Sequence, residues 1–144
     1  MITRDRIMPI LLEACPSFRP TWETELDDED KKLIYICLGT LAHHLAKLHR
    51  EQHREEFPAV AKAIESLCVE GDHFTQEAAV IGLLEGIQNV WGNQDLDPEE
   101  FQRFLLPAGA KGWADLNRFW SNLGEYYRTH PRGPRGGTPN SEGR

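Results

Sequence analysis

The chain has 144 residues, is 40% hydrophobic and 27% charged, and carries a formal net charge of −7. This length suffices for one buried core and hardly for two. The negative charge disfavours binding to a nucleic-acid backbone, which attracts basic surfaces. The longest strongly apolar run, Ala78 to Ile87, falls far short of the ~20 residues that span a bilayer, and the N-terminus lacks a signal-peptide pattern. We therefore expect a cytoplasmic protein with no nucleic-acid or membrane partner.

The first expected helix contains a proline. Thr3 to Ala14 has apolar residues at helical spacing, and Pro9 interrupts the pattern. A helix capped by Thr3 would be kinked at Pro9, because proline removes an internal hydrogen bond. The alternative is a helix that begins nearer Met8. The next segment, Cys15 to Pro20, predicts a turn-rich break followed by one or two further helical turns.

The densest charge in the chain follows, in a run of acidic residues: Glu23, Glu25, Asp27, Asp28, Glu29 and Asp30. One interpretation is local, since acids favour the positive end of a helix and Asp27 or Asp28 can cap the next one. The other is an acidic patch for a basic protein partner. We predict these six residues as the partner-binding set.

The longest helix is predicted from Lys31 to about Gln52, with a bundle-type apolar seam and Gly39 as a close-approach point beside it. Near its end, His49 and His53 have metal-ligand spacing, with Glu56 close behind. The H-E-x-x-H order is missing, so we interpret this stretch as a surface helix terminus. We predict no metal, no cofactor and no catalytic residue, and we expect the three widely spaced cysteines to be buried free thiols.

The stretch from Phe57 to Trp91 organises the chain as two helices joined by a tight turn. Gly71 can adopt the left-handed conformation that ends a helix, and Asp72 can cap the next one. The second helix has small residues at every fourth position. Such a stripe indicates that a neighbouring helix lies close against its backbone, and its members are Ala78, Gly82 and Gly86.

Glu85 is the exception in this otherwise apolar helix. It could be a buried carboxylate with a raised pKa that acts as an acid or base. It could also accept hydrogen bonds from a tryptophan, an arginine or a helix N-terminus, which we prefer because no histidine, cysteine or second carboxylate shares its face. A possible pocket would be lined by Glu85, Gln88, Trp113 and Trp120.

The C-terminal third begins with a strong helix start at Asp97-Pro98. Pro107 to Gly112 is predicted as a loop, without a phosphate-binding pattern. A last helix, Trp113 to about Tyr127, has an aromatic stripe that we expect in the core. We assign residues 1–127 to the helical domain, and we predict that residues 128–144, rich in Gly, Pro and Arg, are disordered.

Several motifs together resemble a family of small bacterial proteins classed only as a domain of unknown function. They are Cys15-Pro-Ser-Phe18 with Trp22, Leu38-Gly39, Val69-Glu-Gly-Asp72, Ala78 to Glu85, and Trp113 with Phe119-Trp120. The resemblance covers Thr3 to Trp120. It implies an all-helical fold whose central hairpin is similar to a HEAT-type repeat, and a likeness in size to immunity proteins of bacterial toxin systems. It implies no catalytic residues.

We therefore predict an all-α fold, a single-domain bundle or short HEAT-like array of about six helices. The first functional hypothesis is a non-catalytic, immunity- or antitoxin-like module that binds a basic protein through the acidic run. The alternative is a small enzyme or ligand-binding protein with a pocket near Glu85, His43 or His44 and the C-terminal tryptophans. A third hypothesis is a subunit that self-associates through an exposed apolar helix face.

Overall fold

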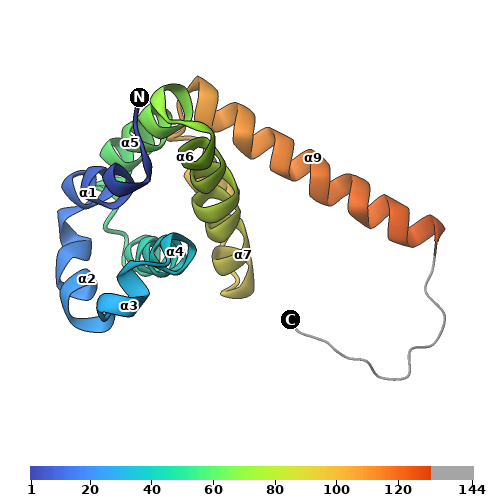
Figure 1. Ribbon diagram of the computed structural model, residues 1–144. Helices are drawn as coiled ribbons and strands as arrows, with labels where there is room; N and C mark the ends of the chain where they lie inside the picture. Colours follow the sequence, from blue (N-terminus) through green and yellow to red (C-terminus); the bar gives the residue numbers. More distant parts are fainter. Residues whose placement is uncertain (131–144) are drawn as a thin grey trace. The chain divides into compact units, whose positions relative to one another are not determined.

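The computed structural model describes residues 1–130, in which the backbone forms helices, an isolated β-bridge and no strand (Figure 1). The all-α prediction is confirmed. Two compact units are present, Met1–Trp113 and a second that begins at Ala114. The elements are α1 (Arg4–Ala14), the 3₁₀ turn η1 (Pro16–Phe18), α2 (Arg19–Glu25), α3 (Asp28–Lys31), α4 (Ile34–Arg50), α5 (Phe57–Glu70), α6 (His73–Glu77), the π-helical segment η2 (Ala78–Leu84), α7 (Glu85–Asn93), α8 (Glu99–Gln102) and α9 (Pro107–Thr129).

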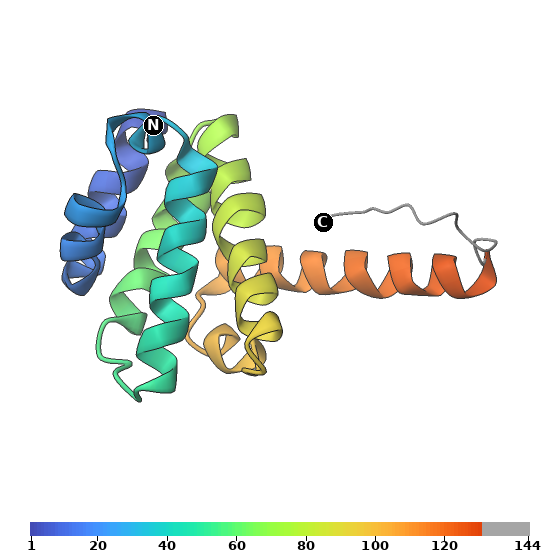
Figure 2. The same cartoon turned by 90° about the horizontal axis from the view of Figure 1, so that it is seen from below.

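The core of the first unit forms where α4 packs against η2 and α7, while α1 packs against α5 (Figure 2). The predicted apolar seam of α4 is buried, and its members are Ile34, Leu38, Leu41, Leu45 and Leu48. A Cβ added at Gly82 would lie 2.6 Å from the Leu38 side chain, and one at Gly86 would lie 3.5 Å from Ala42. The close neighbour predicted from the small-residue stripe is therefore α4. The close approach predicted at Gly39 is wrong, since no atom lies within 4 Å of a Cβ added there.

The N-terminal residues cross the turn between α5 and α6. The backbone N–H of Ile2 donates to Glu70 at 2.8 Å, and the Ile2 carbonyl accepts from Asp72 at 2.8 Å. Asp72 also caps α6, as predicted. The left-handed conformation predicted for Gly71 is wrong, because its φ of −79° and ψ of 154° are extended. Glycine is required there for space, since an added Cβ would lie 2.4 Å from the Leu67 carbonyl.

The predicted helix from Lys31 is in fact two helices. Asp27 and Asp30 form a reciprocal capping box that starts the single turn of α3. The chain then becomes extended at Leu33, and α4 begins at Ile34. At this break the Arg4 guanidinium donates to the Lys32 carbonyl at 2.6 Å. Longest of the described helices is α9, with 23 residues.

Two further predictions concern proline. Thr3 is the N-cap of α1 and Pro9 lies inside that helix, so the alternative start near Met8 is wrong. The loop predicted from Pro107 to Gly112 is also wrong, because α9 begins at Pro107. The Glu65 carboxylate of α5 receives the first free N–H groups of α9, from Ala108 at 3.0 Å and Gly109 at 2.9 Å.

The second unit begins at Ala114, and its described part is mainly the stretch of α9 from Ala114 to Thr129. The core position expected for the aromatic stripe is confirmed at Trp113 and Leu116, and it is wrong further along, since Phe119 and Trp120 are exposed. The predicted disordered tail starts at Arg128, whereas α9 continues to Thr129. The remainder of that prediction falls on residues 131–144, outside the described residues.

Candidate functional site

The six predicted partner-binding acids lie on and beside α2 and α3. Asp30 is half-buried and the other five are exposed. Three of them have local partners. Asp27 and Asp30 cap α3 reciprocally, and Glu29 pairs with Lys32 at 3.1 Å. That ion pair is highly exposed, so it contributes little to stability. The other members of the run, Glu23, Glu25 and Asp28, extend the negative surface along both helices.

An exposed apolar group follows directly after the acidic run. Leu33, Tyr35 and Ile36 are 51%, 43% and 44% exposed, although each is a large hydrophobic side chain. They border an apolar groove of about 280 Å³. We call it the apolar groove, and its lining residues are Arg4, Leu33, Ile34, Tyr35, Ile36 and Phe74. Exposed apolar surface rimmed by charge is typical of a protein-interaction site.

Arg4 connects the apolar groove to a second depression. Its guanidinium lies 5.0 Å from the centre of the Phe74 ring and also donates a hydrogen bond to the Lys32 carbonyl. The second depression has about 380 Å³ and is also lined by Trp22, Lys31 and Ile34. Lys31 lies 5.2 Å from the Trp22 ring, a cation–π distance. The apolar surface therefore continues between α1 and α2, beside the acidic run.

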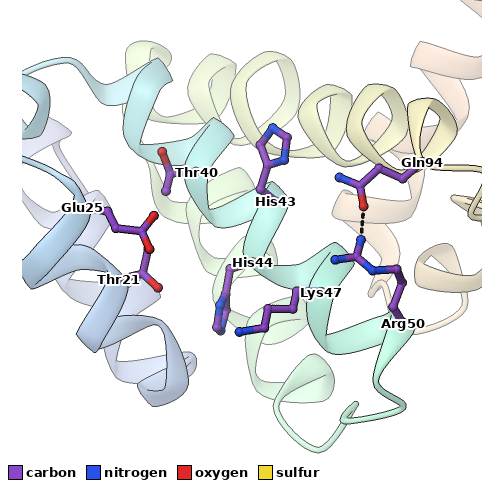
Figure 3. A pocket seen from close by; sticks show the side chains of 8 residues that line it. All are labelled: Thr21, Glu25, Thr40, His43, His44, Lys47, Arg50 and Gln94. Atoms are coloured by element: carbon purple, nitrogen blue, oxygen red, sulfur yellow. Dashed lines mark hydrogen bonds between the residues drawn. The ribbon is translucent and has the colours of Figure 1, made fainter.

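A separate groove between α2 and α4 is strongly polar and has about 250 Å³ (Figure 3). His44 and Lys47 of α4 extend toward the side of Thr21 and Glu25 on α2, whereas Arg50 is hydrogen-bonded to Gln94. We call it the polar groove, and its lining residues are Thr21, Glu25, Thr40, His43, His44, Lys47, Arg50 and Gln94. The mixture of cationic, anionic and hydroxyl groups suits a small polar ligand.

Next to the polar groove, His44 belongs to a hydrogen-bonded cluster with Ser17, Glu56 and Cys15. Ser17 Oγ donates to Glu56 at 2.7 Å and lies 2.8 Å from His44 Nε2. A hydroxyl has one proton, so His44 must donate to Ser17. In a serine nucleophile the imidazole instead accepts the hydroxyl proton. The cluster thus has the residue types of a catalytic triad with the opposite hydrogen-bond direction.

The ionisation of this cluster agrees with its geometry. Burial raises the pKa of the Cys15 thiol to about 12, with its hydrogen bond to Glu56 adding to the effect. Burial also lowers the pKa of His44, so the imidazole is neutral at pH 7. Burial opposes ionisation of Glu56, but the hydrogen bonds from Ser17 and Cys15 outweigh it and lower the pKa. A protonated thiol and a weakly basic carboxylate do not make an activated nucleophile.

His49 was predicted at a surface helix terminus, and that prediction is wrong because its side chain is buried. Its Nδ1 accepts from Arg54 at 2.8 Å, and its Nε2 lies 3.2 Å from Glu100. The ring stacks on Trp91 with centroids 4.5 Å apart. Burial lowers the pKa of His49, with the nearby Arg54 charge acting in the same direction. His49 therefore has a structural position in the core.

None of the four residues of the other predicted pocket lines the polar groove. Glu85 and Gln88 are on α7, and burial is the single cause of the raised pKa of Glu85. Trp113 is buried, and its indole N–H donates to Glu99 at 3.0 Å. Trp120 belongs to the second unit. In residues 1–130, no group of three or more His, Cys, Asp or Glu side chains is placed to hold a metal ion.

Sequence reasoning missed the apolar groove and the Ser17 cluster, and it named His43 and His44 of the polar groove only together with residues that do not line it. Ser17 meets His44 and Glu56 across sequence separations of 27 and 39 residues, for which periodicity gives no signal. The apolar groove did have a signal. Leu33 to Ile36 are consecutive apolar residues, and the start of a helix cannot turn all of them to one side.

A family model described as a domain of unknown function (DUF7674) matches residues 8–121. The chain belongs to this family. The match agrees with the resemblance drawn from the motifs between Thr3 and Trp120, and it confirms that the relatives form an uncharacterised family. No match was found among curated proteins or among solved structures. None of the described helices of this DUF7674 chain has both the length and the apolar character needed to cross a membrane.

Proposed function

We propose that this DUF7674 chain is a non-catalytic, cytoplasmic protein-binding module of the immunity or antitoxin kind, which binds a basic protein through the acidic run. The observation that carries the proposal is the direct succession of exposed acids, Glu23 to Asp30, and exposed apolar side chains, Leu33 to Ile36. Acids steer a basic partner toward the surface, and apolar contacts hold it once it arrives.

The charge of residues 1–127 supports this proposal. Residues 1–127 hold 12 basic and 22 acidic residues, which gives that part a formal charge of −10. His44 donates to Ser17, whereas the imidazole next to a serine nucleophile accepts the hydroxyl proton, and this difference supports a non-catalytic function. The tight turn between α5 and α6 supports the proposed HEAT-like hairpin.

The test is affinity capture from the native lysate with matched variants. Glu23→Lys with Asp28→Lys reverses two exposed charges and leaves the Asp27–Asp30 capping box intact. Glu51→Lys with Glu55→Lys reverses two exposed charges elsewhere. We expect the first pair to release a basic protein that the wild type and the second pair retain. Equal retention by both pairs would place the binding site elsewhere.

A small-molecule ligand is the second candidate, and the polar groove is the observation that favours it. Lys47 and Arg50 offer positive charge beside the imidazole of His43. Glu85 and the tryptophans of the original hypothesis do not line this groove. The test is a thermal-shift screen of small anionic compounds, with Lys47→Ala as the control. A compound that stabilises the wild type and the variant equally would not be bound there.

A further inference from the structure

The polar groove carries positive charge in a chain that is negative overall. Two cations, Lys47 and Arg50, and one carboxylate, Glu25, give its lining a formal charge of +1 with neutral histidines, whereas the whole chain has −7. Lys47 and Arg50 lie three residues apart on α4, so they share one side of that helix. Arg50 is hydrogen-bonded to the neutral amide of Gln94, and within residues 1–130 neither cation is paired with a carboxylate. The groove therefore attracts a small anion.

His44 gives the same groove a fixed hydrogen-bond acceptor. Because Ser17 donates its one hydroxyl proton to Glu56, the Nε2 atom of His44 carries the hydrogen that joins the ring to Ser17. The lowered pKa of His44 keeps the ring neutral at pH 7, so its other nitrogen, Nδ1, has a free lone pair. No residue of the described part of the chain donates to Nδ1. The ring also packs against Phe18 with centroids 5.4 Å apart, which holds this acceptor in place.

Oxygen atoms line the groove at the end opposite Arg50. Thr21 and Glu25 of α2 supply a hydroxyl and a carboxylate, and Thr40 of α4 supplies a second hydroxyl. The Thr40 hydroxyl donates to the Ile36 carbonyl at 2.9 Å, so its oxygen remains an acceptor. Figure 3 shows these oxygens at one end of the groove and the guanidinium at the other. A ligand that spans the groove therefore meets positive charge at one end and acceptors at the other.

We propose that the polar groove binds a small hydroxylated molecule that carries one oxyanion, a carboxylate or a phosphate group. Lys47 and Arg50 bind the oxyanion through charge-assisted hydrogen bonds, and hydroxyl groups of the ligand donate to Glu25 and to Nδ1 of His44. A bare anion would leave these acceptors unpaired, and a cation would be repelled by Lys47 and Arg50. The volume of about 250 Å³ suits a ligand of few carbon atoms. This inference rests on the second candidate function, the small-molecule ligand.

The test is an NMR titration of the full chain at pH 7 with glycerate, glycerol 3-phosphate, inorganic phosphate and glycerol. We expect glycerate or glycerol 3-phosphate to bind roughly tenfold more tightly than inorganic phosphate and glycerol not to bind, because only the first two satisfy both ends of the groove. The tighter of the two identifies the oxyanion as carboxylate or phosphate. Lys47→Gln should weaken this binding roughly tenfold, and the matched control Lys62→Gln, exposed on α5, should not.

Three outcomes would overturn the inference: neither hydroxylated probe binds, inorganic phosphate binds equally well, or Lys47→Gln binds as the wild type does. Cations near the C-terminal end of α4 also favour its macrodipole, so the readout is binding and not stability. If the thermal-shift screen instead finds an anionic compound without hydroxyl groups that depends on Lys47, the hydroxylated class is wrong while the small-molecule function stands. If the screen finds no compound, both fail.

Glu25→Ala separates recognition of the hydroxyl groups from general electrostatics. Loss of this carboxylate should tighten the binding of inorganic phosphate, because a repulsion is removed, and weaken the binding of the hydroxylated probe, because an acceptor is removed. A change in the same direction for both probes would contradict the proposed contact. Nitrogen-15 NMR of the imidazole tests His44 directly. We expect Nδ1 to be unprotonated in the free chain and its signal to shift when the probe binds, and a protonated Nδ1 in the free chain would overturn its role as acceptor.

Discussion

The carboxylate of Glu65 accepts the backbone N–H of Gly109, 44 residues later in the chain, at 2.9 Å. A side chain of α5 thus caps the start of α9, where a helix has unpaired N–H groups. This tertiary cap supports a helix start in a stretch that contains two glycines, Gly109 and Gly112, whose helix propensity is low.

Removing this cap should destabilise the first unit. We expect Glu65→Ala to lower the free energy of unfolding by about 1–2 kcal/mol, the usual cost of losing an N-cap. Urea unfolding of the full chain measures the change. The control is Glu70→Ala, an exposed acid at the end of the same helix. An equal loss in both variants would mean that negative charge on α5, rather than the cap, is responsible.

Gly71 should not tolerate a side chain. Its added Cβ would lie 2.4 Å from the Leu67 carbonyl and 2.6 Å from Thr75. We expect Gly71→Ala to destabilise the chain by about 1–3 kcal/mol, as overpacked sites do. Gly39→Ala, where the added atom has open space, should instead stabilise α4 by about 0.5–1 kcal/mol. Thermal and urea unfolding compare the two variants, and the same sign for both would refute this account.

Stability should fall as pH decreases from 7 to 5. Burial lowers the pKa of both His44 and His49 in the folded chain. The unfolded chain therefore binds protons first, near the ordinary histidine pKa of about 6.5, and folding loses free energy below it. Protonation of His49 would also remove the acceptor for Arg54.

Urea unfolding across this pH range measures the effect. His49→Gln keeps a polar side chain without titration, so its stability should decrease less steeply with falling pH. His53→Gln, at an exposed position, is the control. A wild type that becomes more stable toward pH 5 would contradict the prediction.

The thiols should be unreactive in the folded chain. Burial raises the pKa of Cys15 to about 12 and of Cys68 to about 11, and it also raises that of Cys37. Thiolate is the reactive form, so alkylation at pH 7.5 should be slow until urea unfolds the chain. Mass spectrometry of the alkylated protein gives the rate at each site. Rapid labelling of Cys15 in the folded state would show that its cluster opens.

Local patterns predicted the elements whose stabilising contacts are close in sequence. Asp72 caps α6 as its residue type predicted, and spacing predicted both the buried apolar seam of α4 and the close packing of Gly82 against a neighbouring helix. The start of α9 could not be predicted from local patterns, because the Glu65 carboxylate that caps it belongs to another helix. Periodicity identified the aromatic stripe around Phe119 but not its exposure, since spacing defines a face and says nothing about what covers it.

The candidate sites depend more strongly on long-range contacts. The acidic run was evident from composition, whereas the apolar groove beside it needs Arg4 and Phe74 from distant parts of the chain. Likewise, His44 was named as a possible pocket residue, whereas its partner Ser17 comes from another segment of the chain.

The central claim is that the acidic run and the apolar groove together bind a basic protein. Its most direct test is affinity capture from the native lysate at low and high salt. The wild type is compared with a double variant that carries both Leu33→Ser and Ile36→Ser. We predict that the wild type retains a basic protein at low salt and releases it at high salt, because salt screens exposed charges. The double variant should fail to retain this protein at either salt concentration. A captured protein whose retention is unaffected by salt and by the apolar substitutions would contradict the account.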